Sequence, residues 1–225
     1  PFFYCTGLVI GGTTCGGKKM IDELMSDVKE VYVVELPNRQ SEYGLELWRK
    51  EIIRFKEYLE GRFHIVITDE MVKKAIHLSN ENRRAVQRLY GLMKLDPPPM
   101  SGRELFQILY GNKYQLDLEK VPGILDQVRE KILEEYHRDP PAKKKPRILI
   151  TGCPMGGDSS KLVDIIEDNG GVVVAFENCT GIKAQDRLVD EENPDIYEAL
   201  AERYLMIGCA LMTPNDNRIE HMGRL

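Results

Sequence analysis

The chain has 225 residues, 42% of them hydrophobic and 30% charged, which is typical of a globular protein and argues against an intrinsically disordered one. Its 31 Lys and Arg residues against 36 Asp and Glu give a net charge of −5, which disfavours nonspecific binding to nucleic acid. The longest apolar run, residues 172–176, is too short to cross a bilayer, and no N-terminal stretch has the pattern of an export signal.

Residues 7–36 have the pattern of a βαβ unit. Apolar residues 8–10 predict a short strand, a glycine-rich turn follows, and residues 18–29 predict a helix. The β-branched residues 31–34 predict a second strand, so the unit favours a parallel sheet. The apolar side chains of the predicted helix lie on one side of it: Met20, Ile21, Leu24 and Val28.

A long helical stretch follows. Residues 45–59 and 71–92 each carry apolar side chains at helical spacing, and residues 121–136 predict another amphipathic helix. Between them, Ser101 and Glu104 have the spacing of a capping box that opens a short helix to Tyr110. We expect the polar residues of the second helix to form a solvated face, with contact to an anionic ligand as the other interpretation: Asn80, Asn82, Arg83 and Arg84.

Residues 139–146 are the best linker candidate, because this proline- and lysine-rich stretch cannot continue a helix. Its lysines are either solvated or bind an anion. The βαβ pattern then returns with a strand at 148–150, a helix at 162–167 and a strand at 172–176. We expect Asp158 or Ser159 to cap that helix, Asn169 and Gly170 to end it, and Asn193 with Pro194 to begin a last helix through Tyr204.

The two βαβ units predict an α/β fold with two Rossmann-like lobes, whose parallel sheets are joined by a helical segment. Ile10, Gly12, Gly16 and Gly17 correspond to Ile150, Gly152, Gly156 and Gly157, which argues for similar lobes that face each other across a cleft at the strand ends. We assign residues 1–66 to the first lobe, 67–138 to the helical segment, 139–146 to the linker and 147–225 to the second lobe. Because the chain begins at Pro1 and ends at Leu225 within a helical pattern, we expect both lobes to be truncated.

The turn around Cys15 allows three interpretations. Gly12, Gly17 and Lys18 match the G-x-x-x-x-G-K spacing of a phosphate loop, although Lys19 replaces the hydroxyl residue that holds Mg²⁺. Alternatively, Cys15 is a metal ligand, because helix amides and the neighbouring lysines favour the thiolate form. In the third interpretation the glycines only make a tight turn and Cys15 is packed.

The second glycine-rich turn and the remaining cysteines are also ambiguous. The backbone amides of the second turn either hold a phosphate or carboxylate or are structural. Cys179 follows a strand end and either contacts a ligand or belongs to a structural turn. Cys153 is interpreted as a packed turn residue, and Cys5 and Cys209 as buried. Five cysteines without disulfide-like spacing indicate a reducing cytoplasm.

Several ordered segments resemble the 2-hydroxyacyl-CoA dehydratase and benzoyl-CoA reductase superfamily. Residues 10–19 resemble its T-T-C-D-G-K-K segment, and further matches follow at residues 35–38, 80–83, 95–102, 147–154, 177–181, 207–210 and 214–215. The chain is most similar to the double-cubane cluster branch, through Phe2-Phe3-Tyr4, Leu109-Tyr110-Gly111 and Gly156-Gly157.

The resemblance implies a dimeric cytoplasmic iron–sulfur protein with Rossmann-like lobes, which receives low-potential electrons from an ATP-hydrolysing iron–sulfur activator. It implies a [4Fe-4S] or double-cubane [8Fe-9S] cluster in an anaerobic, oxygen-sensitive enzyme, with Cys15 as the one matching cluster ligand. Catalytic residues are not identified. Residues that the motifs imply to face substrate or phosphate are Thr14, Gly17, Lys18, Gly152, Gly156, Gly157, Glu177 and Cys179.

The chain departs from the family pattern around Cys15. Gly7, Gly12 and Gly16 stand where the family has acidic residues, a difference of about three charge units. One thiolate cannot hold a cubane, which needs about three or four, so we expect an internal piece of the iron–sulfur subunit. The expected function is the catalytic component of a low-potential, ATP-coupled small-molecule reductase of the double-cubane type. The alternatives are an (R)-2-hydroxyacyl-CoA dehydratase subunit, which removes water through a ketyl radical, or a cluster-free CoA- or phosphate-binding module.

Overall fold

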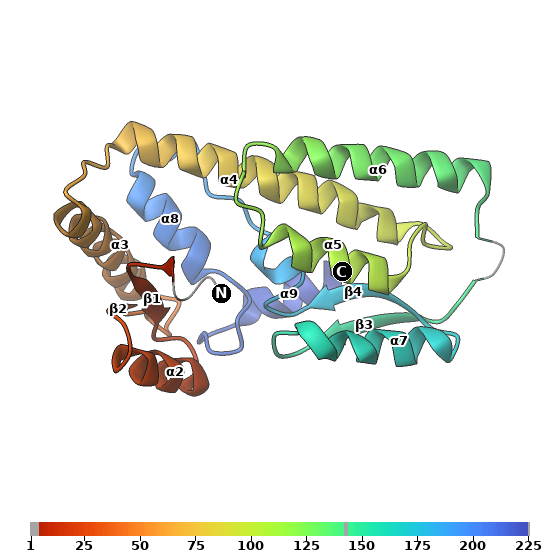
Figure 1. Ribbon diagram of the computed structural model, residues 1–225, viewed down its shortest axis with the longest axis horizontal. Helices are drawn as coiled ribbons and strands as arrows, with labels where there is room; N and C mark the ends of the chain where they lie inside the picture. The colour runs from red at the N-terminus through yellow and green to blue at the C-terminus, as the bar shows by residue number, and fades with distance from the viewer. Residues whose placement is uncertain (1–4, 142–143, 225) are drawn as a thin grey trace. The chain divides into compact units, whose positions relative to one another are not determined.

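The structure is a computed structural model that describes residues 5–141 and 144–224, arranged in two compact units (Figure 1). The first unit contains residues 1–73 and 189–221, and the second contains residues 74–188 and 222–225. The Phe2-Phe3-Tyr4 match lies outside the described residues. The domain boundaries expected from the sequence stay a prediction.

The first unit contains the predicted parallel βαβ arrangement. Strands β1 (Val9–Gly12) and β2 (Val31–Val34) pair in parallel with Val9 opposite Val31, and helix α2 (Gly16–Ser26) connects them. The Tyr32 ring of β2 packs against Phe55 and Tyr58 of α3 (Glu42–Phe63), with its centroid 4.2 Å from that of Tyr58. One face of the small sheet is therefore covered by α3.

Helix α2 turns its polar side, rather than its apolar side, toward the sheet. Asp22 is buried and accepts the Gly12 N–H at 3.1 Å, and a Cβ atom at Gly11 would lie 2.3 Å from the Asp22 carboxylate. The apolar side chains predicted to lie on one side do so, and more than half of each is exposed: Met20, Ile21, Leu24 and Val28. A glycine at position 11 thus lets a carboxylate, instead of an apolar residue, pack against β1.

Helix α8 (Ile196–Leu205) packs against α3 in the same unit, where Arg49 and Asp195 form an ion pair of 2.7 Å. The expected cap of this helix was wrong. Asp195 is the N-cap and accepts the N–H groups of Tyr197 and Glu198, whereas Asn193, two residues before it, accepts the N–H of Asp195. Helix α9 (Asp216–Arg224) follows near the C-terminus.

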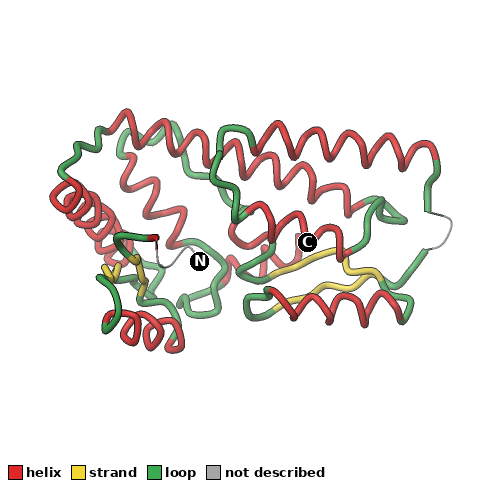
Figure 2. Tube along the Cα trace, in the orientation of Figure 1, coloured by secondary structure: helices red, strands yellow, loops and turns green. Residues whose placement is uncertain are grey.

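The second unit combines helices with another two-stranded parallel sheet (Figure 2). Strands β3 (Arg147–Thr151) and β4 (Val172–Glu177) pair in parallel, with a register shift between Ile148 and Leu149. The helices are α4 (Asp69–Tyr90, which begins in the first unit), the 3-10 helix η1 (Gly91–Lys94), α5 (Gly102–Asn112), α6 (Val121–Arg138), η2 (Gly157–Ser160), α7 (Lys161–Asp168) and η3 (Ile182–Ala184).

The core of the second unit lies between α4, α5, α7 and β4, where the side chains of Leu89, Leu105, Val163, Val173 and Phe176 are almost completely buried. The predicted capping box of α5 is confirmed: Ser101 Oγ accepts the Glu104 N–H at 3.2 Å, and Glu104 accepts the Ser101 N–H at 2.8 Å.

Helix α5 also begins on a carboxylate from another element. Glu167 of α7 accepts the N–H of Gly102 at 2.6 Å and the N–H of Val173 at 3.2 Å. One side chain therefore joins α7, the start of α5 and the start of β4.

The predicted solvated face of α4 was partly wrong. Asn80 is fully buried and Arg83 is 8% exposed, and Arg83 donates to Asn80 Oδ1 at 3.0 Å. Mutual hydrogen bonding allows both polar groups to be buried.

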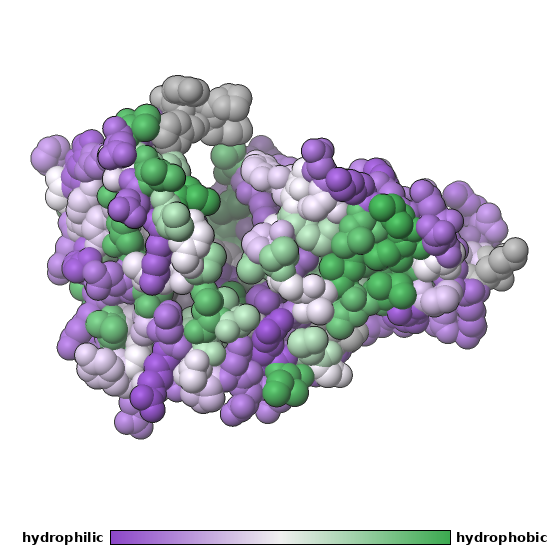
Figure 3. Space-filling model, turned by 90° about the horizontal axis from the view of Figure 1, so that it is seen from below, coloured by the Kyte–Doolittle hydropathy of each residue, from purple (hydrophilic) through white to green (hydrophobic). Residues whose placement is uncertain are grey.

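Helix α7 has exposed apolar side chains on its outer side. Leu162 and Ile165 are 46% and 58% exposed, and Leu149 of β3 is also exposed. Figure 3 shows hydrophobic residues gathered on the face where α7 lies. Among the described residues, no helix has both the length and the apolar character needed to span a membrane.

Candidate functional site

Cys15 lies at the start of α2, directly after the turn that ends β1. It is the N-cap residue, with extended backbone (φ −91°, ψ 162°), and its exposed thiol makes no capping hydrogen bond. Gly16 and Gly17 form the first turn of the helix, and a Cβ atom at either position would meet only open space. The thiol therefore stands at the positive end of the dipole of an 11-residue helix.

The turn around Cys15 is held by groups on both sides of it. Thr13 Oγ1 accepts the Leu36 N–H at 2.7 Å, and Thr13 N–H donates to Val34 O at 3.0 Å. Thr14 is exposed. The Lys18 ammonium is paired with the buried Asp22 carboxylate, so part of its charge is already neutralised. The structure thus brings Thr14, Cys15, Gly17 and Lys18 together in one turn, while their roles stay predictions.

The described residues do not supply a complete ligand set for an iron–sulfur cluster. Within residues 5–141 and 144–224, no three His, Cys, Asp or Glu side chains are grouped so that they could hold a metal ion. Cys15 supplies one thiolate, whereas a cubane needs about three or four. The described residues therefore do not fit a cluster by themselves.

In the second unit, Glu177 is the last residue of β4 and forms a buried ion pair. Its side chain has no exposed surface, and Oε1 lies 2.9 Å from Lys183 Nζ, which is also buried. The Thr151 hydroxyl at the end of β3 donates to the other carboxylate oxygen. Glu177 therefore fixes the carboxyl ends of both strands to the segment that follows β4.

Asn178 organises the turn that leaves β4. Its Oδ1 accepts the N–H of Thr180 at 3.1 Å and of Gly181 at 2.8 Å, while its buried Nδ2 has no partner among the described residues. A Cβ atom at Gly181 would lie 2.0 Å from Phe176 O, so only glycine fits there. Met155 N–H donates to Thr180 Oγ1 at 3.0 Å and so connects the turns after β3 and β4.

The glycines of the turn after β3 are required by its backbone. Gly152 (φ +126°) and Gly157 (φ +49°) adopt conformations that favour glycine, and a Cβ atom at either would meet only open space. The expected cap was wrong for α7, whose N-cap is Ser160 without a side-chain bond. Instead, Ser159 Oγ accepts the Gly156 N–H at 2.7 Å and closes the η2 turn.

The C-terminal end of α5 reaches both turns. Lys113, the C-cap residue of α5, donates from Nζ to Cys179 O at 2.7 Å. Gly156 lies against Tyr110, because a Cβ atom there would be 3.2 Å from the Tyr110 ring. Tyr114, 62% exposed, donates to the Tyr110 hydroxyl at 2.9 Å.

The burial of three cysteines was predicted wrongly. Cys5 and Cys153 are exposed, and Cys209 is only partly buried. Cys153 lies in the exposed turn that follows the end of β3.

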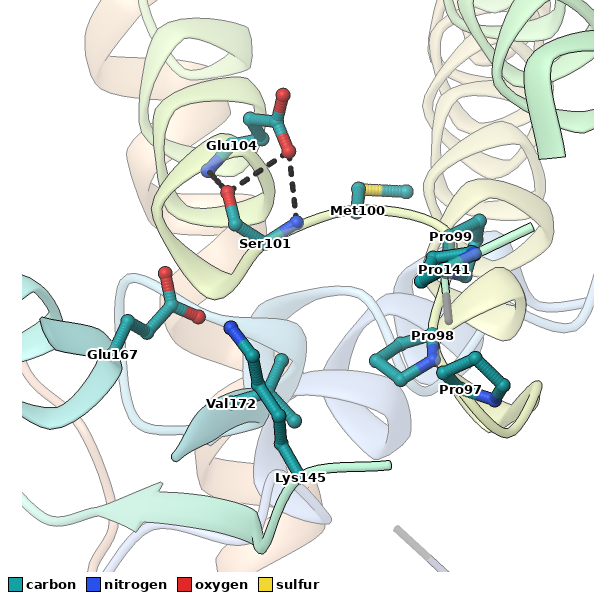
Figure 4. Close-up of a pocket in the computed structure, with 10 residues that line it drawn as sticks. All are labelled: Pro97, Pro98, Pro99, Met100, Ser101, Glu104, Pro141, Lys145, Glu167 and Val172. Carbon is teal, nitrogen blue, oxygen red and sulfur yellow. Dashed lines mark hydrogen bonds between the residues drawn. The ribbon is translucent and has the colours of Figure 1, made fainter. Parts of the chain in front are cut away.

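Sequence reasoning also missed Lys113, Asn178 and Lys183. The signal for Lys113 was its place between Tyr110 and Tyr114, two aromatic residues at helical i, i+4 spacing. A pocket of about 230 Å³ lies away from these turns, beside the starts of α5 and β4 (Figure 4). It has a lining rich in proline, and its Glu104 and Glu167 carboxylates already accept backbone N–H groups at the start of α5.

Comparison with known proteins gives consistent matches. The family model described as "2-hydroxyglutaryl-CoA dehydratase, D-component" matches residues 1–225. The chain is 40% identical over 226 residues to the "Putative dehydratase subunit YjiM" of Escherichia coli (strain K12), covering 100% of this chain and 59% of that protein. It is 23% identical over 202 residues to the "(R)-phenyllactyl-CoA dehydratase beta subunit" of Clostridium sporogenes, covering 88% of this chain and 51% of that protein. The chain thus spans between half and three fifths of the length of these relatives.

Proposed function

Because the chain belongs to the family of the 2-hydroxyglutaryl-CoA dehydratase D-component, we propose that it works as a subunit, or part of one, in an enzyme that dehydrates 2-hydroxyacyl-CoA thioesters. The family match along all 225 residues carries the proposal, and the relative named as a phenyllactyl-CoA dehydratase subunit supports it. In this reaction the C2–OH bond and a C3–H bond break, and the products are a 2-enoyl-CoA and water.

The carboxyl ends of β3 and β4 are proposed as the substrate-facing part of the second unit. Ligands of parallel α/β sheets bind beyond the strand ends, where Gly152, Gly156, Gly157 and Cys179 lie. Glu177 is fully buried in its ion pair with Lys183, so its proposed role is to hold these turns in position.

In the first unit, Cys15 is proposed as one ligand of an iron–sulfur cluster whose other ligands come from outside the described residues. Its exposed thiol at a helix N-terminus supports this role. Thr14, Gly17 and Lys18 are proposed to surround the ligand or its phosphates. The same proposal includes a cytoplasmic location, an ATP-hydrolysing iron–sulfur activator and a second, related subunit.

A reductase of the double-cubane type is the second candidate. The segments at 109–111 and 156–157 that resemble this branch meet in the second unit, where Gly156 lies against Tyr110. A cluster-free CoA- or phosphate-binding module is the third candidate, supported by the two glycine-rich turns.

Iron and acid-labile sulfide, measured on anaerobically purified enzyme with its partner subunits, test the proposal. Dehydration of a 2-hydroxyacyl-CoA with about four irons per cluster site supports the dehydratase, and about eight irons without dehydration support the double-cubane reductase. Colourless protein that binds CoA without iron would leave only the cluster-free module.

The assignment of Cys15 is tested by Cys15→Ser, with Cys5→Ser as a matched control because both thiols are exposed. We expect Cys15→Ser to lose most of the bound iron or to shift the cluster spectrum, and Cys5→Ser to leave both unchanged. Equal iron content and spectra in the two variants would exclude Cys15 as a ligand.

A further inference from the structure

Three segments of the second unit meet at the carboxyl ends of β3 and β4: residues 152–157, residues 178–181 and the end of α5. Met155 N–H donates to Thr180 Oγ1 at 3.0 Å, and Lys113 Nζ donates to Cys179 O at 2.7 Å. The third connection is the packing of Gly156 against the Tyr110 ring. These contacts hold a lysine from a helix end at the strand ends where α/β proteins bind ligands.

The charge of Lys113 lacks an acidic partner. Some lysines of this unit have one, such as Lys183 in Glu177 and Lys144 in Asp96. Among the described residues, Lys113 has no Asp or Glu within ion-pair distance, and its hydrogen bond goes to a neutral carbonyl. The residue is exposed, but partial burial of its ammonium lowers the pKa of Lys113, with a smaller opposing effect from Cys179. A cation placed in this way can still pair with an incoming anion.

Aromatic side chains extend from the core to the same place. The rings of Phe106 and Tyr110 are stacked at 5.7 Å, and those of Tyr110 and Tyr114 meet edge to face at 5.2 Å. Tyr114 ends this row with 62% of its surface exposed. An exposed ring that packs on the partly buried Tyr110 ring, and through it on the buried Phe106 ring, offers a rigid surface for a planar group.

The turns beside Lys113 are open and one of their polar groups is unpaired. A Cβ atom at Gly152 or Gly157 would meet nothing within 4 Å, so the backbone there is accessible. Asn178, next to Cys179, is fully buried, and its Nδ2 has no partner among the described residues. The accessible backbone at these two glycines leaves room for a ligand beside Lys113.

We infer that the end of α5 is a binding site for an organic anion, whose phosphate or carboxylate pairs with Lys113 and whose planar part packs on Tyr114. This inference deepens the proposed function and rests on it for the identity of the natural ligand. It assigns the anion contact to Lys113 and not to Lys183, because Lys183 is buried and already paired with Glu177.

Isothermal titration calorimetry on the full chain tests the site with three probes: CoA, pantetheine, which lacks the phosphates, and lactate, a small 2-hydroxycarboxylate. The variants are Lys113→Gln, Lys113→Arg and Tyr114→Leu. Lys74→Gln is the control, because it removes one positive charge from an exposed pair with Glu119 in the same unit. Loss of a charge-assisted contact weakens binding by about tenfold or more.

We expect Lys113→Gln to lose at least tenfold in affinity, Lys113→Arg to retain binding within about threefold, and Lys74→Gln to bind as the wild type does. If Lys113→Gln loses affinity for CoA alone, the partner of Lys113 is a phosphate. If it loses affinity for lactate alone, the partner is a carboxylate. Equal affinities of wild type and Lys113→Gln, or no binding of any probe by the wild type, would overturn the inference.

The thermal midpoint of Lys113→Gln separates binding from folding. A midpoint of Lys113→Gln that matches that of the Lys74→Gln control shows that weaker binding is not explained by unfolding. If the enzyme dehydrates its substrate with an unchanged KM in Lys113→Gln, the inference fails and the proposed function stands. If the chain binds CoA through Lys113 but no dehydration is found, the inference stands and the proposed function fails.

Discussion

Glu177 and Lys183 illustrate how a single buried pair organises the ends of two strands. Both side chains are buried, and the Glu177 carboxylate also accepts the Thr151 hydroxyl. Two charges removed from water are tolerated only when each satisfies the other, so loss of one leaves an uncompensated buried charge.

Removal of either charge alone should therefore lower the free energy of unfolding more than removal of both charges does. We expect Lys183→Met to lower the free energy of unfolding by about 3–5 kcal/mol, and Glu177→Gln to be similarly damaging. The double variant should be more stable than the sum of the two losses predicts, as measured by urea unfolding in a double-mutant cycle. Additive losses would mean that the two groups do not interact.

Tyr197 makes the first unit sensitive to alkaline pH. Burial and a hydrogen bond of 2.8 Å to Asp69 raise the pKa of Tyr197 to about 12, compared with about 10 in an unfolded chain. Between these pH values the unfolded state loses a proton that the folded state keeps, so stability falls as the pH rises.

Tyr197→Phe should consequently lose less stability than the wild type between about pH 10 and 12. Urea midpoints across this range measure the effect. Tyr43→Phe, which removes a hydroxyl from a 79% exposed residue, is the control and should keep the wild-type slope. If the urea midpoint of Tyr197→Phe fell with pH as steeply as that of the wild type, the loss of stability could not be assigned to Tyr197.

At the scale of elements, the sequence pattern located most helices and strands to within a few residues. β-branched runs marked β2 and β4, and the Ser101 and Glu104 spacing marked the start of α5. The pattern did not show which side of α2 is covered, because periodicity identifies an apolar side without identifying what packs on it. Gly11, which admits the Asp22 carboxylate, decides that orientation.

The exposed side of α2 gives a direct comparison with the core. Leu24 is 66% exposed and Leu89 is fully buried, so Leu24→Ala should change the free energy of unfolding by less than about 0.5 kcal/mol. Leu89→Ala should lower the free energy of unfolding by about 2–5 kcal/mol, because it leaves a cavity in the core. Urea unfolding of both variants measures the contrast, and a cost at Leu24 similar to that at Leu89 would show that this side is covered in solution.

At the scale of the whole molecule, the first unit is assembled from distant parts of the chain. Gln40 N–H donates to Thr213 O at 2.9 Å, and Arg49 pairs with Asp195, across more than 140 residues. Local patterns carry no information about such contacts, which is why the sequence predicted two βαβ units but not this pairing. The same limit applies to the candidate site, where motifs identified the glycine turns while Lys113 became evident only from its contact with Cys179.

The Glu167 carboxylate, which joins α7, β4 and α5, makes contacts that differ in the length of chain they close. Its partner Val173 is six residues away along the chain, whereas Gly102 is 65 residues away. The loop that must close is much shorter in the first case, so the entropy cost of the first contact is smaller. We therefore expect the contact of Glu167 with β4 to form before its contact with α5, so that α5 docks onto a carboxylate that is already positioned.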